Sequence, residues 1–357
     1  MTHMTRVRAR LPALGALAAA TLLVGLTTPA SAHPGHHAAA RIPFTRATVT
    51  AADTAGTYTI SWTAPGTRRV AVEAGGRTVA TGGSTGKATV KGLPAGADRQ
   101  WFDLVPDHGT GLHLADRLIK LDGAVNFRDA GGYRTTDGHW VQMGEIFRSD
   151  ALDKLTDADL AKLRRLGIAA DYDLRTASER AAAPDRVPVG TSYVVADVLA
   201  GSDMTTTMPA TEAGAVAMMT DGEKFMVSGA TAKSAYRQVF SGLAGGDGVV
   251  FHCTAGKDRT GWANAALLTA LGVPRATVLQ DYLASNDYRA QANAAALAAM
   301  PAEQAKVYKP MLDVRAAYLN SGFDEVRDAF GSFSAYERKG LGLDSAELRA
   351  LRAELLV

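Results

Sequence analysis

The sequence has almost no cysteine: Cys253 is the single one in 357 residues. One cysteine cannot form an internal disulfide, which excludes the small secreted domains that disulfides hold together. An excess of charge of either sign is also absent, because the formal net charge is +2. No basic run lies beside stacking aromatic residues. These absences argue against a nucleic-acid-binding protein.

Long hydrophobic runs are missing too, apart from one at residues 11–26. Three arginines between residues 6 and 10 precede this run, and Ala30-Ser31-Ala32 follows it. That order is typical of a signal peptide, and we expect cleavage after Ala32. The alternative is an uncleaved anchor, but the run is shorter than the roughly 20 residues that span a bilayer. The sequence therefore predicts a secreted, extracellular protein without an integral membrane segment after cleavage.

What is present in quantity is apolar sequence, at 47%, with 21% charged residues. Both values are typical of folded proteins, and the length fits about two domains of roughly 100–200 residues each. We assign residues 1–32 to the signal peptide and residues 33–44 to a flexible leader. The leader holds His33, His36 and His37, and a solvated tail explains them better than a metal site does.

Residues 45–117 have the pattern of short strands. Tyr58-Thr59-Ile60-Ser61-Trp62 alternates, Gly75-Gly76 is a hairpin signal, and further turn signals follow about every ten residues. This spacing predicts a small antiparallel β-sandwich. The segment resembles a fibronectin type III-like domain, chiefly in the Ile60-Ser61-Trp62 strand and the Leu93-Pro94-Ala95-Gly96 turn. We find no cluster of catalytic residues in it and expect a spacer or docking surface.

The pattern changes near Leu118, and residues 118–357 alternate short apolar strands with amphipathic helices. This alternation indicates an α/β fold with a central, mostly parallel sheet flanked by helices. Residues 153–166 read as a helix capped by Thr156, while residues 168–174 and 248–252 read as buried strands. A methionine-rich stretch at 202–229 is either a lid-like insertion or a pair of core helices.

The second of those strands leads directly into a loop with a cysteine at one end and an arginine at the other. Its sequence is His252-Cys253-Thr254-Ala255-Gly256-Lys257-Asp258-Arg259-Thr260-Gly261. Successive backbone N–H groups of the loop can point inward as an anion nest. They belong to Thr254, Ala255, Gly256, Lys257, Asp258 and Arg259. The following helix directs its positive end to the same place, and the planar Arg259 fork grips two phosphate oxygens. The loop is therefore a candidate phosphate-binding site.

The same positive field favours the thiolate form of Cys253. A thiolate can attack phosphorus and form a phosphocysteine, with Thr260 donating a hydrogen bond to the sulfur. His252 organises the loop in this interpretation, since a thiolate needs no base. A structural cysteine in a chance Cys-x5-Arg pattern fits the flanking strand, the glycine and the helix poorly.

The loop resembles the signature of a bacterial and fungal family of tyrosine-type phosphatases, and the resemblance extends over about residues 119–357. Further matches are Asn126-Phe127-Arg128-Asp129, Phe147-Arg148-Ser149, Asp173-Leu174-Arg175, Asp281-Tyr282-Leu283, Ser285-Asn286-Asp287, Tyr336 and Leu341-Gly342. The resemblance implies a cysteine-based phosphatase fold and hydrolysis of phosphate monoesters through a cysteinyl phosphate. It implies no metal and no cofactor.

The general acid has more than one candidate. The family places it on a loop after the strand that follows Asp-Leu-Arg, which corresponds to Asp197. Asp258 inside the loop is a competitor, and another residue stays open. Asp173 is interpreted as structural, with Arg175 and Glu179 forming ion pairs near it.

The substrate class also stays open. Lys257 beside Arg259 suits polyanionic ligands such as phosphoinositides, or it adjusts the charge of the loop. Asn126-Phe127-Arg128-Asp129 borders the phosphate pocket or fixes the first loop by ion pairing. The function predicted is a secreted protein tyrosine phosphatase. The alternatives are a dual-specificity or phosphoinositide phosphatase, a sulfurtransferase, and an inactive binding module.

Overall fold

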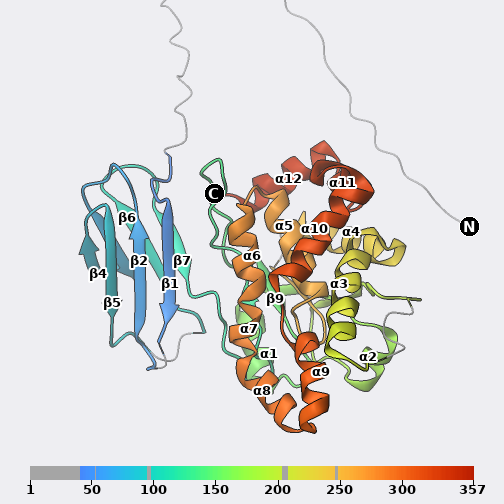
Figure 1. Cartoon of the computed structure of the whole chain (residues 1–357). Helices are drawn as coiled ribbons and strands as arrows, with labels where there is room; N and C mark the ends of the chain where they lie inside the picture. Colours follow the sequence, from blue (N-terminus) through green and yellow to red (C-terminus); the bar gives the residue numbers. More distant parts are fainter. Residues whose placement is uncertain (1–40, 53, 95–97, 203–207, 246–247) are drawn as a thin grey trace, which may run out of the picture. The chain divides into compact units, whose positions relative to one another are not determined.

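A computed structural model describes residues 41–357 except 53, 95–97, 203–207 and 246–247 (Figure 1). The expected signal peptide and most of the expected leader lie outside the described residues. Ala40–Val357 forms one compact unit. In the part of the chain that the structure describes, no helix has the length and apolar character needed to cross a membrane.

The first seven strands pair antiparallel in two sheets, ordered β1-β2-β5 and β4-β3-β6-β7. Alternate side chains of β3 are buried, as expected for strands with one face on a core. Gly75 and Gly76 join β3 to β4 with φ of 57° and 72°, the backbone of a tight hairpin turn. The strands are β1 (Arg46–Ala51), β2 (Tyr58–Thr63), β3 (Val70–Ala74), β4 (Arg77–Gly82), β5 (Thr85–Val90), β6 (Trp101–Pro106) and β7 (Leu112–Ala115).

Two side chains from the later part of the chain pack into the core of these strands. Trp140 and Met143 are buried in one cluster with Phe44, Trp62 and Phe102. Backbone hydrogen bonds link Trp140 with the C-terminal Val357 in both directions, at 2.9 Å each. The packing is therefore continuous across the boundary that the sequence pattern places near residue 118.

A third sheet has five strands in the order β11-β10-β12-β9-β8. Neighbours among β11, β10, β12 and β9 are parallel, and β8 is antiparallel at the edge. The prediction of a mixed α/β fold is confirmed. Because the parallel strands end at one edge of the sheet, the residues that follow them gather there. The strands are β8 (Arg128–Asp129), β9 (Ile146–Ser149), β10 (Ile168–Asp173), β11 (Ser192–Val195) and β12 (Gly248–His252).

Helices make up most of the chain after β9 (Figure 1). Thr156 caps α1 as predicted, through a capping box with Asp159. The helix begins at Asp157 and not at Asp153, because the extended Thr156 backbone marks its start. The helices are α1 (Asp157–Arg165), α2 (Ala177–Ala182), α3 (Glu212–Ser228), α4 (Ala230–Leu243), α5 (Arg259–Ala270), α6 (Arg275–Leu283), α7 (Ser285–Tyr288), α8 (Ala290–Ala298), α9 (Ala302–Leu312), α10 (Ala316–Phe330), α11 (Phe333–Lys339) and α12 (Ser345–Leu355).

The methionine-rich stretch contributes helix α3, which packs against α10 and α9 (Figure 1). Its Met226 is buried in the core, and Met204 lies outside the described residues. A lid over the cysteine loop stays a prediction.

Candidate active site

The cysteine loop lies between β12 and α5, at the carboxyl edge of the parallel strands. Cys253 follows the last residue of β12, and α5 begins at Arg259 itself. Gly256 has a φ of +66°, and a Cβ there would lie 2.3 Å from the carbonyl oxygen of Ser149. Only glycine allows the loop to pass this close to the end of β9.

Cys253 is buried at the base of this loop, with 2% of its surface exposed. Burial raises the pKa of Cys253, but the charge of Arg259 and the hydrogen-bond donors of Thr260 outweigh it and bring the pKa below its ordinary value. A cysteine that is buried and still acidic is one whose surroundings favour the thiolate. The surroundings of Cys253 therefore favour its thiolate form, and its role as a nucleophile stays a prediction.

Arg259 is fixed by an acidic partner that the sequence did not identify. Its two terminal nitrogens donate to the Glu179 carboxylate at 2.7 and 2.8 Å. Burial raises the pKa of Glu179, but the hydrogen bonds and charge of Arg259 lower it to about 2. Glu179 lies in α2 and was expected beside Asp173. The ion pair expected between Arg175 and Asp173 is present, at 2.7 Å.

Three side chains donate hydrogen bonds to backbone carbonyl oxygens of the loop. The Asn126 amide donates to the carbonyl oxygens of Ala255 and Gly256 at 3.0 and 3.2 Å. Arg148 donates to the Gly256 oxygen at 2.8 Å, and Arg289 donates to the Ala255 oxygen at 3.3 Å. A peptide carbonyl pulled to one side turns the N–H of the same peptide group to the other. These contacts therefore favour an anion nest on the Cys253 side.

Asp281 anchors this layer of donors. Its carboxylate accepts from Arg148 at 2.6 Å, from Asn264 at 2.6 Å and from Tyr133 at 3.0 Å. Burial raises the pKa of Asp281, but the charges of Arg148 and Arg128 and the Asn264 hydrogen bond lower it to about 2. The carboxylate is therefore ionised near neutral pH, and three side chains donate hydrogen bonds to it.

The Asn126-Phe127-Arg128-Asp129 segment lies behind the loop. The buried Arg128 guanidinium donates to the side-chain oxygen of Asn126 and to the Ser285 hydroxyl at 3.1 Å. Arg128 and Asp129 take different ionic partners, Asp281 at 3.5 Å and Arg99 at 2.6 Å. The arrangement favours the structural interpretation of this motif over a direct contact with phosphate.

His252 lies below the loop between two carboxylates. Its Nε2 is 3.3 Å from Asp171 Oδ1 and 3.3 Å from Asp185 Oδ2. Burial lowers the pKa of His252, but the charge of Asp171 and hydrogen bonds with both carboxylates raise it well above its ordinary value. The three side chains bring ligand-type atoms within 4.8 Å of one another.

The two candidate general acids differ in their surroundings. Asp197 lies two residues after β11, and its carboxylate is 3.5 Å from Arg180 and accepts from the Leu199 N–H. Asp258 is held by the Lys257 ammonium group at 2.7 and 2.8 Å. Lys257 itself is 3% exposed. One candidate is thus at the edge of the sheet, and the other is paired inside the loop.

A buried acid beside the loop was missed from the sequence. Glu223 of α3 is fully buried, and one of its oxygens accepts from the Tyr282 hydroxyl at 2.6 Å. Burial is the main cause that raises the pKa of Glu223 to about 8, and the negative charge of Asp258 adds to it. An isolated glutamate in a helix gives no sequence signal, because its burial depends on the packing of α3.

A cleft of about 560 Å³ opens beside the loop. Side chains of both signs line it, among them Asp122, Asp150, Lys154, Glu179, Thr254 and Arg289. The lining includes Thr254 of the loop and Glu179, which binds Arg259, so the cleft borders the loop.

The fold and this loop define a class of protein: an α/β protein with a Cys-x5-Arg loop between a strand and a helix. The chain belongs to the tyrosine phosphatase family, whose model matches residues 119–357. The prediction of a tyrosine phosphatase enzyme is confirmed at the level of the family.

Individual relatives agree with this assignment. A Cupriavidus necator protein that carries a tyrosine-protein phosphatase name is 38% identical over 240 residues, 65% of this chain and 86% of its own. The triple specificity protein phosphatase PtpB of Mycobacterium tuberculosis is 32% identical over 276 residues, 66% of this chain and 98% of its own. The structure of Pseudomonas aeruginosa TpbA matches 60% of this chain and 90% of its own, at 14% identity, with a TM-score of 0.26. That score is too low to support an argument.

Proposed function

We propose that the protein is a secreted protein tyrosine phosphatase that hydrolyses phosphate monoesters through a cysteinyl phosphate. The observation that carries the proposal is the geometry of the loop, with the buried Cys253 at the end of β12 and Arg259 at the start of α5. The surroundings of Cys253 also bring the pKa of its thiol below the ordinary value. Membership of the tyrosine phosphatase family supports the same substrate class. Export rests on the N-terminal sequence pattern alone.

In the first step the Cys253 thiolate attacks phosphorus, and the bond from phosphorus to the tyrosine oxygen breaks. The leaving oxygen takes a proton from the general acid. In the second step a water molecule attacks phosphorus and gives a proton to the general acid, which the first step left deprotonated. The sulfur–phosphorus bond breaks, Cys253 leaves as the thiolate, and inorganic phosphate is released. Thr260 supports the departing thiolate as a hydrogen-bond donor.

The phosphoryl oxygens are bound by loop N–H groups from Thr254 to Asp258 and by Arg259. A guanidinium has five N–H donors, and Glu179 takes one from each terminal nitrogen of Arg259. The same two nitrogens also donate, at 3.5 Å to the Leu174 carbonyl oxygen and at 3.4 Å to the Thr254 hydroxyl. The Nε–H is therefore the Arg259 donor most available to phosphate. His252 supports the loop from below through Asp171 and Asp185.

Asp197 is the general acid in this proposal. Strands β11 and β12 are both parallel neighbours of β10, so Asp197 and Cys253 follow strands that end at the same edge. Two strand spacings amount to about 10 Å, a span that a phosphoryl group and its leaving group can fill. Asp258 is less suited, because Lys257 holds both of its oxygens.

A phosphoinositide phosphatase is the alternative that the sequence kept open through Lys257. The Lys257 side chain is buried and its ammonium group is engaged by Asp258. It is therefore poorly placed to bind a second phosphate group. The phosphoprotein substrate is the better supported of the two.

The first test is hydrolysis of a phosphotyrosine peptide by the mature protein in the presence of EDTA, beside Cys253→Ser. We expect metal-independent turnover that the substitution abolishes. Phosphoinositides are assayed in parallel. Turnover of the lipid alone would replace the proposed substrate, and no turnover of either would favour the inactive, ligand-binding alternative.

A further inference from the structure

We infer that the first seven strands help to position the cysteine loop, and that Arg99 is the positioning residue through which they do so. The inference rests on the proposed function. It assigns a task to a segment that lies outside the residues matched by the tyrosine phosphatase family, 119–357.

The first contact is a buried ion pair between Arg99 and Asp129. Their side chains are 2.6 Å apart and only 4% and 0% exposed. The Asp129 carboxylate also accepts the N–H groups of Gly131 at 2.6 Å and Gly144 at 2.7 Å. A carboxylate this deeply buried needs a cation beside it, and Arg99 supplies the charge.

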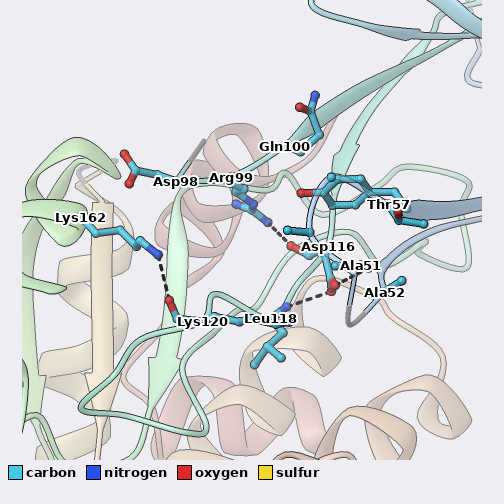
Figure 2. A pocket seen from close by; sticks show the side chains of 13 residues that line it. Ala51, Ala52, Thr57, Asp98, Arg99, Gln100, Asp116, Leu118, Lys120 and Lys162 are labelled. Carbon is cyan, nitrogen blue, oxygen red and sulfur yellow. Dashed lines mark hydrogen bonds between the residues drawn. The ribbon is translucent and has the colours of Figure 1, made fainter. Parts of the chain in front are cut away.

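Residues in the segment that contains strands β1–β7, called the stranded segment below, contact Arg99 on its other sides. The guanidinium lies 4.3 Å from the centre of the Trp101 ring, at the start of β6. It also donates to the backbone oxygen of Asp116 at 3.2 Å, a contact visible in Figure 2. The same figure shows the Asp116 carboxylate accepting from Leu118 and from Ala51 of β1. Arg99 thus joins β1, β6 and the chain that enters β8.

The second contact leads from Asp129 to the loop. Asp129 and Arg128 are the two residues of β8, the edge strand of the five-stranded sheet. A strand of two residues has few ladder hydrogen bonds, so contacts of its side chains hold it in place. Arg128 binds the Asn126 side chain. Asn126 in turn holds the carbonyl oxygens of Ala255 and Gly256.

The chain of contacts therefore ends on the peptide groups that line the phosphate site. A shift of β8 would loosen Asn126 and let these carbonyls rotate, which weakens the anion nest on the Cys253 side. The expected result is a less acidic thiol and a slower first chemical step.

Full-length protein is needed for the test, because Trp140 and Met143 pack inside the core of the stranded segment. Removing residues before 118 would expose both side chains. Point variants keep that core intact. The variants are Arg99→Gln and the double variant Arg99→Gln/Asp129→Asn, which leaves no unpaired charge buried and so protects the fold.

The matched control is Asp98→Asn. Asp98 is the neighbour of Arg99 and forms an ion pair with Arg165, at 2.5 Å, whose side chains are 26% and 56% exposed. The control removes an ion pair next to Arg99 whose two members, Asp98 and Arg165, lie outside β8. Loss of a partly exposed ion pair has little effect.

The measurements are the pH midpoint for alkylation of Cys253 by iodoacetamide, and kcat and KM for p-nitrophenyl phosphate. We expect both Arg99 variants to raise the midpoint by about one pH unit and to lower kcat on the order of 10-fold. We expect Asp98→Asn to stay within about twofold of the wild type. Restoration of the midpoint by Arg99→Lys would support the role of the charge.

A wild-type midpoint and kcat in the double variant would overturn the inference, as would equal changes in Asp98→Asn. Alkylation needs no turnover. A protein that shows the shifted midpoint but hydrolyses no phosphate ester would therefore contradict the proposed function and leave the positioning role standing.

Discussion

The carboxylate of Glu179 binds both terminal nitrogens of Arg259, at 2.7 and 2.8 Å. The pair sets the plane of the guanidinium before any phosphate arrives. It also links α2, which carries Glu179, to the first residue of α5. Because Arg259 is the residue proposed to grip the phosphoryl group, its orientation is part of the site.

Glu179→Gln is expected to lower kcat/KM by about 10- to 100-fold, since hydrogen bonds to charged groups contribute about 1.5–3 kcal/mol. The pKa of Glu179 is about 2, so the wild-type pair stays intact over the whole assay range. Steady-state kinetics with p-nitrophenyl phosphate measures the loss. Glu303→Gln, which weakens an exposed ion pair with Lys306, is the control. Equal kinetics in Glu179→Gln and wild type would show that Arg259 needs no acidic partner.

Asn126→Ala should slow turnover by at least about 10-fold, because two loop carbonyls lose their shared donor. The effect is expected in kcat and in binding of vanadate, a phosphate analogue. Asn293→Ala is the matched control, since Asn293 is also buried and donates to a backbone oxygen, that of Leu312. If both variants lose the same activity, the loss reflects stability and not the loop.

Asp197→Asn should slow hydrolysis of an alkyl phosphate about 10²-fold or more. p-Nitrophenyl phosphate should be affected far less, because its leaving group needs little protonation. The ratio of the two rates is the measurement, with Asp258→Asn assayed beside it. An unchanged rate on the alkyl phosphate would remove Asp197 from the mechanism, and a change confined to Asp258→Asn would transfer the role to the loop.

Glu223→Gln should make stability less dependent on pH. The pKa of Glu223 is about 8 in the folded protein against 4.5 as its ordinary value. Between these values the folded state binds the proton more tightly, so wild-type stability falls as pH rises. From roughly pH 5.5 to pH 8.5, the free energy of unfolding of the variant should therefore rise by about 3 kcal/mol relative to that of the wild type.

Urea unfolding at both pH values measures that gain. Glu354→Gln, an exposed position in α12, controls for the substitution itself. A difference between Glu223→Gln and wild type that does not change with pH would show that the carboxyl is ionised in the folded state.

Local patterns predicted the elements better than their ends. The α/β alternation after residue 118 and the strand before Cys253 are present in the structure. Helix α1 starts later than its apolar pattern suggests, because Thr156 is extended and caps it. Helix α5 starts at Arg259, inside the loop motif, because the loop leads directly into its first turn. Caps and loop ends depend on single backbone angles that periodicity does not encode.

The sequence by itself determined the chemistry of the loop, because all of its groups lie within ten consecutive residues. The cysteine, the glycine, the arginine and the strand–helix context are local properties, and their spacing alone predicts an anion site with a nucleophile. Tertiary structure alone decided what holds that loop. Asn126 lies 129 residues before Ala255, Glu179 lies 80 before Arg259, and Arg99 lies 30 before Asp129. Such contacts form only when the strands are assembled in the sheets, so no local sequence pattern predicts them.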